Sequence, residues 1–505
     1  MSQILPHEEL DRRQSSIDMD AASFREAGHQ LVNDIADLLT SIRNIKVTTS
    51  PTPRSLQVKL PQEMPLTGMK TESLIKESWQ LLVNNSLFNG HPRFWGYITS
   101  SPAPLGMLGD LLSSAVNSNC GAFVLSPMAT EIEKQTILWL GTMIGYPAGA
   151  GIMVSGGNMA NFVAFLAARK AKAHWDIRKL GLQPAEGKLR IYTSAETHTW
   201  INKAADLFGL GLDAIRWIPI DADLRMNAEI LDQKITEDKK QGFIPFIVIG
   251  TAGSVGTGAV DPLKEIASIC KKHDCWFHVD GAYGGFAAAL PELKNLFDGI
   301  GMADSIAIDP HKWLYSPLEA GCTLVKNPEA LTDAFSFHPV YYNFDGENEP
   351  QTNFYEGGFQ NSRGFRALKV WLGLRQIGTQ GHIQLIREDI QLAKKLFEIL
   401  KEYQDIEVFT QQLSITTFRY KPAGMNSTAD KEYLNELNQA LLNRLQAGGE
   451  VFPSNAVVND NFLLRVCIVN FRTRFSDIET LPVVVLREGE LIHAQMQKIK
   501  KPKVP

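Results

Sequence analysis

Short apolar, β-branched runs alternate with longer amphipathic segments through the middle of this chain, and this alternation limits the possible folds most strongly. The run at residues 246–249 contains no polar residue, which is typical of a strand that is covered on both faces. Alternating strands and helices predict an α/β domain with a mostly parallel sheet. The predicted strands lie at residues 152–154, 189–193, 243–250, 275–279, 305–308 and 322–325.

The pattern changes near residue 380. A long helical segment at residues 383–403 precedes strand-like segments near 415–420 and 462–469, which together predict a smaller α+β domain. A chain of 505 residues allows about three domains. We therefore predict an N-terminal helical and extended segment at residues 1–102, a large domain at 103–380 and a small C-terminal domain at 381–505.

Composition and charge argue against several classes of protein. Hydrophobic residues make up 44% of the chain and charged residues 21%, which is ordinary for a globular protein and unlike a disordered or fibrous one. The net charge of -5 gives no support to nucleic-acid binding. No apolar run reaches the ~20 residues that cross a bilayer. We therefore expect neither a nucleic-acid nor a membrane partner.

The cysteines are few and scattered. An odd number of them, 5 in the whole chain, suggests reduced thiols and a cytoplasmic location, and the N-terminus lacks the apolar core of a secretory signal. Cys270 and Cys275 flank His273, which invites a metal site. No second pair of ligands follows at the spacing that zinc requires, so we expect no metal.

Lys312 follows the predicted strand at residues 305–308 and lies between His311 and Trp313. A lysine that is kept from water among such neighbours loses its proton more easily and becomes a nucleophile towards carbonyl groups. That is what a Schiff-base lysine requires. The alternative is a solvated lysine without a chemical role.

Asp280 ends another apolar run and precedes small residues, among them Ala282. A buried carboxylate needs a cation nearby. A structural salt bridge or a helix cap could satisfy it, and so could the protonated ring nitrogen of pyridoxal phosphate, with Ala282 against the ring face. Asp280 and Lys312 are 32 residues apart, enough for one crossover, so both are expected at the same edge of the sheet.

Three further segments carry small or polar residues after predicted strands. Gly156, Gly157 and Asn158 lie at a strand-to-helix turn, where free backbone N–H groups suit a phosphate. His198 could stack on a planar cofactor, although a lone histidine is more often structural. Ser254 lies in a glycine-rich segment that could contact a cofactor or substrate, or could simply be a loop. None of these segments has the glycine fingerprint of a dinucleotide site.

Together these segments resemble the group II pyridoxal-phosphate-dependent amino-acid decarboxylases, which include aromatic-L-amino-acid and glutamate decarboxylases. The resemblance runs from about residue 20 to near the C-terminus. It rests on HPRFWGY at residues 91–97, SGGNMAN at 155–161, His198, HVDGAYGG at 278–285 and PHKW at 310–313.

The resemblance implies a fold and a set of cofactor contacts. The fold would be the large domain of fold type I pyridoxal-phosphate enzymes. Lys312 would hold the cofactor covalently, and Asp280 would pair with its ring nitrogen. The implied contacts with the ring and the phosphate come from His198, Ala282, Gly156, Gly157, Asn158, Ser254, His311 and Ser100.

The resemblance also implies substrate contacts. Tyr97, Phe123 and Arg363 would lie near the substrate, and Trp95 would be within reach. Tyr341 would be the mobile-loop tyrosine that protonates the carbanion after CO2 leaves, although Tyr342 is adjacent. One departure from the family motif is Asp309, where the family usually has asparagine.

The sequence thus predicts a decarboxylase that converts an L-amino acid, with an aromatic one favoured, to the amine and CO2. Alternatives on the same fold are a decarboxylase of an acidic amino acid (glutamate, aspartate or cysteine sulfinate), a decarboxylation-dependent aldehyde synthase and an aminotransferase. An inactive binding scaffold is the alternative from another class. The resemblance further implies a homodimer with active sites at the interface, in which the N-terminal segment wraps the partner.

Overall fold

The computed structural model describes residues 17–182, 187–337 and 351–500, with a few isolated positions before residue 17. It forms two compact units, Met1–Phe88 and Asn89–Pro505. Within the described residues, no helix has both the length and the apolar character needed to cross a membrane.

The first unit is helical. The Asp20 side chain accepts hydrogen bonds from the backbone N–H groups of Ala22 and Ser23, which fixes the start of the longest helix. The helices of this unit are α2 (Ala21–Ser41), α3 (Pro53–Gln57) and α4 (Thr71–Asn85).

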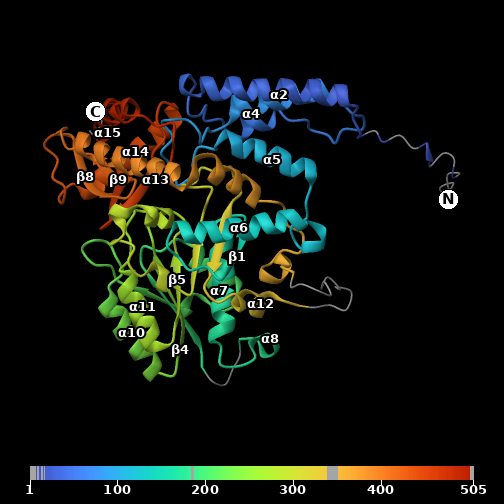
Figure 1. Ribbon diagram of the computed structural model, residues 1–505. Coiled ribbons are helices and arrows are strands. Elements are labelled where there is room, and N and C mark those ends of the chain that lie inside the picture. Colours follow the sequence, from blue (N-terminus) through green and yellow to red (C-terminus); the bar gives the residue numbers. More distant parts are fainter. Residues whose placement is uncertain are drawn as a thin grey trace. The chain divides into compact units, whose positions relative to one another are not determined.

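The second unit contains a seven-stranded sheet with the order β1-β7-β6-β5-β4-β2-β3. Figure 1 labels β1, β5 and β4 of this sheet. Only β7 is antiparallel to its neighbours, so the sheet is mostly parallel, as predicted. The strands are β1 (Ala150–Val154), β2 (Leu189–Ser194), β3 (Ile215–Ile218), β4 (Ile244–Thr251), β5 (Trp276–Asp280), β6 (Ser305–Ile308) and β7 (Gly321–Val325).

Helices cover both faces of this sheet. The crossover through α7 (Gly157–Lys172) runs from β1 towards β2, whereas those through α10 (Ala228–Lys240) and α11 (Leu263–His273) run in the opposite direction. Because such crossovers are right-handed, α7 lies on one face, and α10 and α11 lie on the other. The central strand β4 is therefore buried on both faces, and its side chains at 246–249 have no exposed surface.

The remaining helices of the second unit flank this core or lie on the small sheet. They are α5 (Pro104–Val116), α6 (Pro127–Met143), α8 (Ile177–Leu180), α9 (Trp200–Leu207), α12 (Glu329–Phe335), α13 (Ala367–Leu400), α14 (Lys431–Gly448) and α15 (Phe475–Lys500).

A four-stranded antiparallel sheet with the order β10-β11-β9-β8 forms the C-terminal part. It packs with α14 and α15 around an apolar cluster of its own, so the predicted α+β pattern after residue 380 is present. Gly378 interrupts the helical geometry of α13 near the predicted boundary, but the division into three domains stays a prediction. The strands are β8 (Ile406–Gln412), β9 (Ile415–Tyr420), β10 (Ser454–Val458) and β11 (Asn461–Cys467).

Candidate active site

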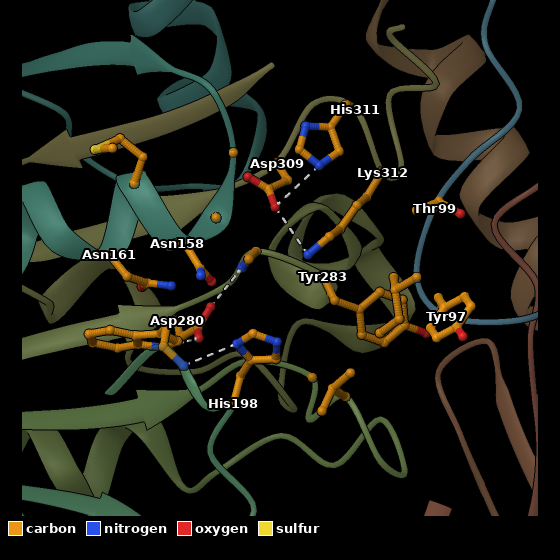
Figure 2. A pocket seen from close by; sticks show the side chains of 18 of the residues that line it. Tyr97, Thr99, Asn158, Asn161, His198, Asp280, Tyr283, Asp309, His311 and Lys312 are labelled. Carbon is orange, nitrogen blue, oxygen red and sulfur yellow. Dashed lines mark hydrogen bonds and ion pairs between the residues drawn. The ribbon is translucent and has the colours of Figure 1, made fainter. Parts of the chain in front are cut away.

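A cavity of about 620 Å³ lies at the carboxyl ends of the parallel strands. The strands β1, β2, β4, β5 and β6 run in the same direction, so the segments that follow them meet at one edge of the sheet. Figure 2 shows Lys312, Asp280 and His198 turned towards the same space. The predicted site residues that line the cavity are Tyr97, Gly156, Gly157, Asn158, His198, Asp280, Ala282, His311 and Lys312.

Lys312 lies on the turn that follows β6. Its backbone N–H donates to the Asp309 carbonyl, and the next residue, Trp313, is fully buried and stacks on Tyr283 at a ring distance of 4.8 Å. The indole Nε1 of Trp313 also donates to Asp389 Oδ2 over 3.1 Å. These contacts of Trp313 anchor the turn, which leaves the lysine side chain directed into the cavity.

Asp280 lies at the last position of β5 and is almost fully buried. Its Oδ2 accepts a hydrogen bond of 2.7 Å from Trp200 Nε1, and its Oδ1 accepts one of 3.2 Å from the Ala282 backbone. Among the residues with described positions, no cation forms an ion pair with this carboxylate. The described part of the chain therefore does not contain the salt bridge that would give Asp280 a purely structural role.

His198 follows β2 and precedes α9. Its Nδ1 accepts a hydrogen bond of 3.3 Å from the backbone of Trp200, which fixes the orientation of the ring. Desolvation by the cavity wall lowers the pKa of His198 below its usual 6.5, so the ring is mostly neutral at pH 7. A neutral flat ring at the cavity wall is suited to stacking on another ring.

The glycine turn lies between β1 and α7. An added Cβ on Gly157 would lie 2.8 Å from Asp309 Oδ2 and 3.0 Å from the Ala282 side chain, so there is no room for a larger residue. α7 begins at Gly157, and its first N–H groups have no partner within the helix. At this turn a ligand can come close to the backbone, and the positive end of a 16-residue helix faces it. This is the geometry that binds phosphate.

Ser100 and Ser254 lie beside the cavity but do not line it. Ser100 is buried, and its Oγ donates to the His311 carbonyl over 2.7 Å, so it supports the turn that carries Lys312. Ser254 Oγ lies 2.9 Å from Thr257 Oγ1 and accepts the Thr257 backbone N–H. Its hydroxyl is therefore used within its own turn.

Arg363 does not line the cavity. Its side chain is 1% exposed, and its Nη2 lies 2.5 Å from Glu133 Oε1 and 2.7 Å from the Met153 carbonyl. A buried cation needs such partners, and Glu133 satisfies Arg363 within the core. This placement differs from the predicted position near the substrate. This pairing could not be predicted from local sequence patterns, because Glu133 lies 230 residues away.

Other predicted substrate residues also lie elsewhere. Phe123 is in a short 3-10 helix, where its backbone donates to Asn353 Oδ1, and it does not line the cavity of this chain. Trp95 is fully buried in the C-terminal cluster, with Nε1 donating to Thr473. Tyr341 lies outside the described residues.

Several cavity residues were not predicted from the sequence. Arg465 comes from β11, where its Nε donates to Ser454 Oγ over 3.0 Å and its Nη1 donates to the Val255 carbonyl. Trp200, Glu319 and Thr99 also line the cavity. A charged residue inside an apolar strand was the only sequence signal for Arg465, and that signal does not say which surface the residue faces.

Comparisons with known proteins agree with this geometry. A family model described as the pyridoxal-dependent decarboxylase conserved domain matches residues 53–421. The aromatic-L-amino-acid decarboxylase of Bacillus atrophaeus is 34% identical over 466 residues, which cover 91% of this chain and 94% of that protein. The phenylacetaldehyde synthase of Petunia hybrida is 30% identical over 468 residues, which cover 89% of this chain and 91% of that protein.

Solved structures extend the similarity to three dimensions. The crystal structure of Oryza sativa TDC with PLP and tryptamine superposes with a TM-score of 0.87 at 26% sequence identity. The superposition covers 95% of this chain and 100% of that chain. The fold is therefore shared along nearly the whole length, including the strands that carry the cavity residues.

Proposed function

This chain belongs to the pyridoxal-dependent decarboxylases, and we propose that it converts an aromatic L-amino acid to the corresponding amine and CO2. The reaction class and the cofactor, pyridoxal 5′-phosphate, follow from the family. The observation that carries the assignment of residues is that Lys312 and Asp280 reach one cavity from the ends of neighbouring strands.

The cavity residues fit this cofactor. Asp280 is a nearly buried carboxylate without an ion-pair partner in the described structure, so a protonated ring nitrogen would supply its missing cation. Gly157 leaves no room for a Cβ beside the start of α7, as expected where a phosphate approaches the backbone. Lys312 is the lysine among the lining residues, and its amine can reach an aldehyde in the same cavity.

Bound pyridoxal phosphate supplies an electron sink for the pair of electrons that CO2 leaves behind. In our proposal Lys312 binds the cofactor through Nζ, and Asp280 keeps a proton at the ring nitrogen. His198 and Ala282, which line the same cavity, would hold the ring, as the resemblance implies for these positions. The lining residues also exclude water from the reacting atoms and orient the scissile carboxylate. Tyr341 returns a proton to the α-carbon; this assignment rests on the resemblance alone.

The charges of the cavity favour an aromatic substrate over an acidic one. Arg465 is a buried cation in the wall and, in our proposal, binds the α-carboxylate of the substrate. A second carboxylate would need a second cation, yet the wall adds the acidic Glu319. Tyr97 and Val255 offer apolar surface instead. The similarity to the Bacillus atrophaeus enzyme supports the same choice.

An aldehyde synthase is the second candidate, because the Petunia hybrida relative carries that name. In the plant aldehyde synthases the loop tyrosine is replaced by phenylalanine, whereas this chain has Tyr341. We therefore propose simple decarboxylation. Equal amounts of amine and CO2 without oxygen uptake are expected, and stoichiometric aldehyde and peroxide would overturn the proposal.

The deciding experiment is an amine-release and CO2-release assay of the enzyme loaded with cofactor. Aromatic amino acids should be decarboxylated with a higher kcat/KM than glutamate, aspartate or cysteine sulfinate. Lys312→Ala, which removes the attachment amine, is the control and should lose activity by several orders of magnitude. A preference for an acidic substrate would contradict the assignment.

We also propose a homodimer with active sites at the interface and a cytoplasmic location. Exposed apolar side chains on α5, including Leu108, Leu111 and Leu112, support an interface. All five cysteines are buried and unpaired, which is consistent with a reducing compartment. The substrate is a small amino acid, in agreement with the family.

A further inference from the structure

Asp309 and Lys312 form an ion pair in the cavity wall. Asp309 directly follows β6, and its Oδ2 lies 3.0 Å from Lys312 Nζ and 3.6 Å from His311 Nε2. The Asp309 side chain is 1% exposed, whereas that of Lys312 is 18% exposed. Figure 2 shows the two charged groups pointing towards each other.

The Asp309 carboxylate has few other partners. Its Oδ1 is buried and has no hydrogen-bond partner in the described structure. Its Oδ2 lies beside the glycine turn, 2.8 Å from the place that a Cβ on Gly157 would occupy. A carboxylate this deeply buried is strongly destabilising unless a cation compensates it. Lys312 is thus the group that makes an ionised Asp309 tolerable.

The neighbouring titratable groups do not replace this cation. Desolvation lowers the pKa of both His311 and His198, so both rings are mostly neutral near pH 7. Desolvation raises the pKa of the Cys322 thiol, which therefore stays protonated. The charge that remains beside Asp309 is that of Lys312.

The other charged side chains of the cavity are Asp280, Glu319 and Arg465. The two acids cannot compensate a carboxylate. Asp309 forms its ion pair with Lys312 and also lies beside the neutral His311 ring, and no described ion pair joins it to Arg465. Arg465 is instead hydrogen-bonded to Ser454.

We propose that Asp309 is a positioning residue that holds the ammonium group of Lys312 at the cavity wall whenever this lysine is not bound to the cofactor. The importance of the pair for catalysis rests on the proposed function of Lys312, but the pair itself does not depend on any substrate. While it is held, Nζ stays beside the glycine turn. Without Asp309, Nζ is free to move.

The first test measures the reactivity of Lys312 in the cofactor-free protein. A low concentration of acetic anhydride acylates neutral amines, and peptide mass spectrometry compares acetylation of Lys312 with that of Lys264. Lys264 pairs with Asp298 at the surface over 2.8 Å and serves as the internal reference. Because Asp309 engages the Lys312 amine in a charge-assisted contact, Asp309→Asn should raise the relative acetylation of Lys312 about tenfold.

A matched control is Glu398→Gln, which removes the surface partner of Lys395 and should leave the acetylation of Lys312 relative to Lys264 unchanged. Asparagine has the shape of aspartate, and circular dichroism would confirm that Asp309→Asn is folded. Equal relative acetylation of Lys312 in the wild type and in folded Asp309→Asn would overturn the proposal. No substrate enters this test, so its failure leaves the proposed decarboxylation untouched.

A second test uses thermal unfolding of the cofactor-free protein with Asp309→Asn, Lys312→Met and the double variant. Lys312→Met should lower Tm, because the buried Asp309 carboxylate then has no cation. Adding Asp309→Asn should restore most of that loss, which a structural role for either residue alone does not predict. Additive effects of the two substitutions would overturn the proposal, and an unchanged Tm in Lys312→Met would overturn it even if Asp309→Asn does not fold.

Discussion

Single side chains around the cavity act through short hydrogen bonds to other side chains. Trp200 is fully buried, and its Nε1 donates to Asp280 Oδ2 over 2.7 Å. Its indole also lies edge-on to the ring of His278, which is held by Asn161 and Ser305. This layer behind Asp280 fixes the direction of a carboxylate that would otherwise be free to rotate.

Replacing Trp200 by phenylalanine removes this hydrogen bond and keeps an aromatic ring. A hydrogen bond to a charged group contributes about 1.5–3 kcal/mol. We therefore expect pyridoxal phosphate to bind roughly tenfold more weakly, as measured by equilibrium dialysis with the purified cofactor. The control is Trp217→Phe, which changes an exposed tryptophan. Unchanged cofactor affinity in Trp200→Phe would mean that Asp280 needs no such support.

Replacing Gly157 by alanine tests the closeness of the glycine turn. The new Cβ would overlap Asp309 Oδ2 at 2.8 Å, and both neighbours are buried. We expect cofactor retention after gel filtration to fall at least tenfold, because the turn must shift by several tenths of an ångström. Gly373→Ala, whose Cβ would meet nothing within 4 Å, is the control and should retain cofactor normally.

Secondary-structure elements are joined to the site by buried ionisable side chains. Asp389 on α13 accepts hydrogen bonds from Trp313 Nε1 over 3.1 Å and from the Tyr315 hydroxyl over 2.8 Å. Both donors lie on the turn that carries Lys312, so a helix remote in sequence holds the reactive turn. Desolvation raises the pKa of Asp389 to about 8.

This raised pKa has a consequence for stability. Folded Asp389 keeps its proton up to about pH 8, whereas the unfolded side chain loses it near its ordinary value of 3.8. The contribution of Asp389 to stability is therefore full below pH ~4 and decreases as the pH rises towards 8, by a few kcal/mol in total. Asp389→Asn should remove this decrease, which a comparison of Tm between about pH 5 and about pH 8 would detect. A parallel pH dependence in both proteins would contradict the prediction.

The pair of Arg363 and Glu133 joins α6 to the loop before α13. Breaking a buried pair costs about 3–5 kcal/mol, so Arg363→Met should lower the free energy of unfolding by that amount. Arg387→Met breaks an exposed pair with Glu292 and should cost less than about 1 kcal/mol. If Arg363→Met instead raised KM for the substrate without loss of stability, the arginine would have the substrate role that the sequence predicted.

At the scale of the whole molecule, the exposed apolar side chains of α5 indicate a surface that a partner covers. Leu108 and Leu112 are about half exposed and lie one turn apart on this helix. Leu108→Glu with Leu112→Glu should convert the proposed dimer to monomer in sedimentation velocity, with weaker activity. Leu180→Glu changes an equally exposed leucine on α8 and should leave the dimer intact. A wild-type protein that is active as a monomer would contradict the dimer.

The sequence by itself determined the mostly parallel sheet and the position of Lys312 and Asp280 at the same edge of it, because both depend on local signals. Apolar runs of strand length define the strands, and parallel strands bring their carboxyl ends together whatever the detailed packing. Only the tertiary structure decided that Arg465 enters the cavity, that Arg363 turns into the core, and that Trp200 supports Asp280. Each of these three placements depends on a buried partner that is far away in the sequence. A local sequence pattern does not indicate which residue that partner is.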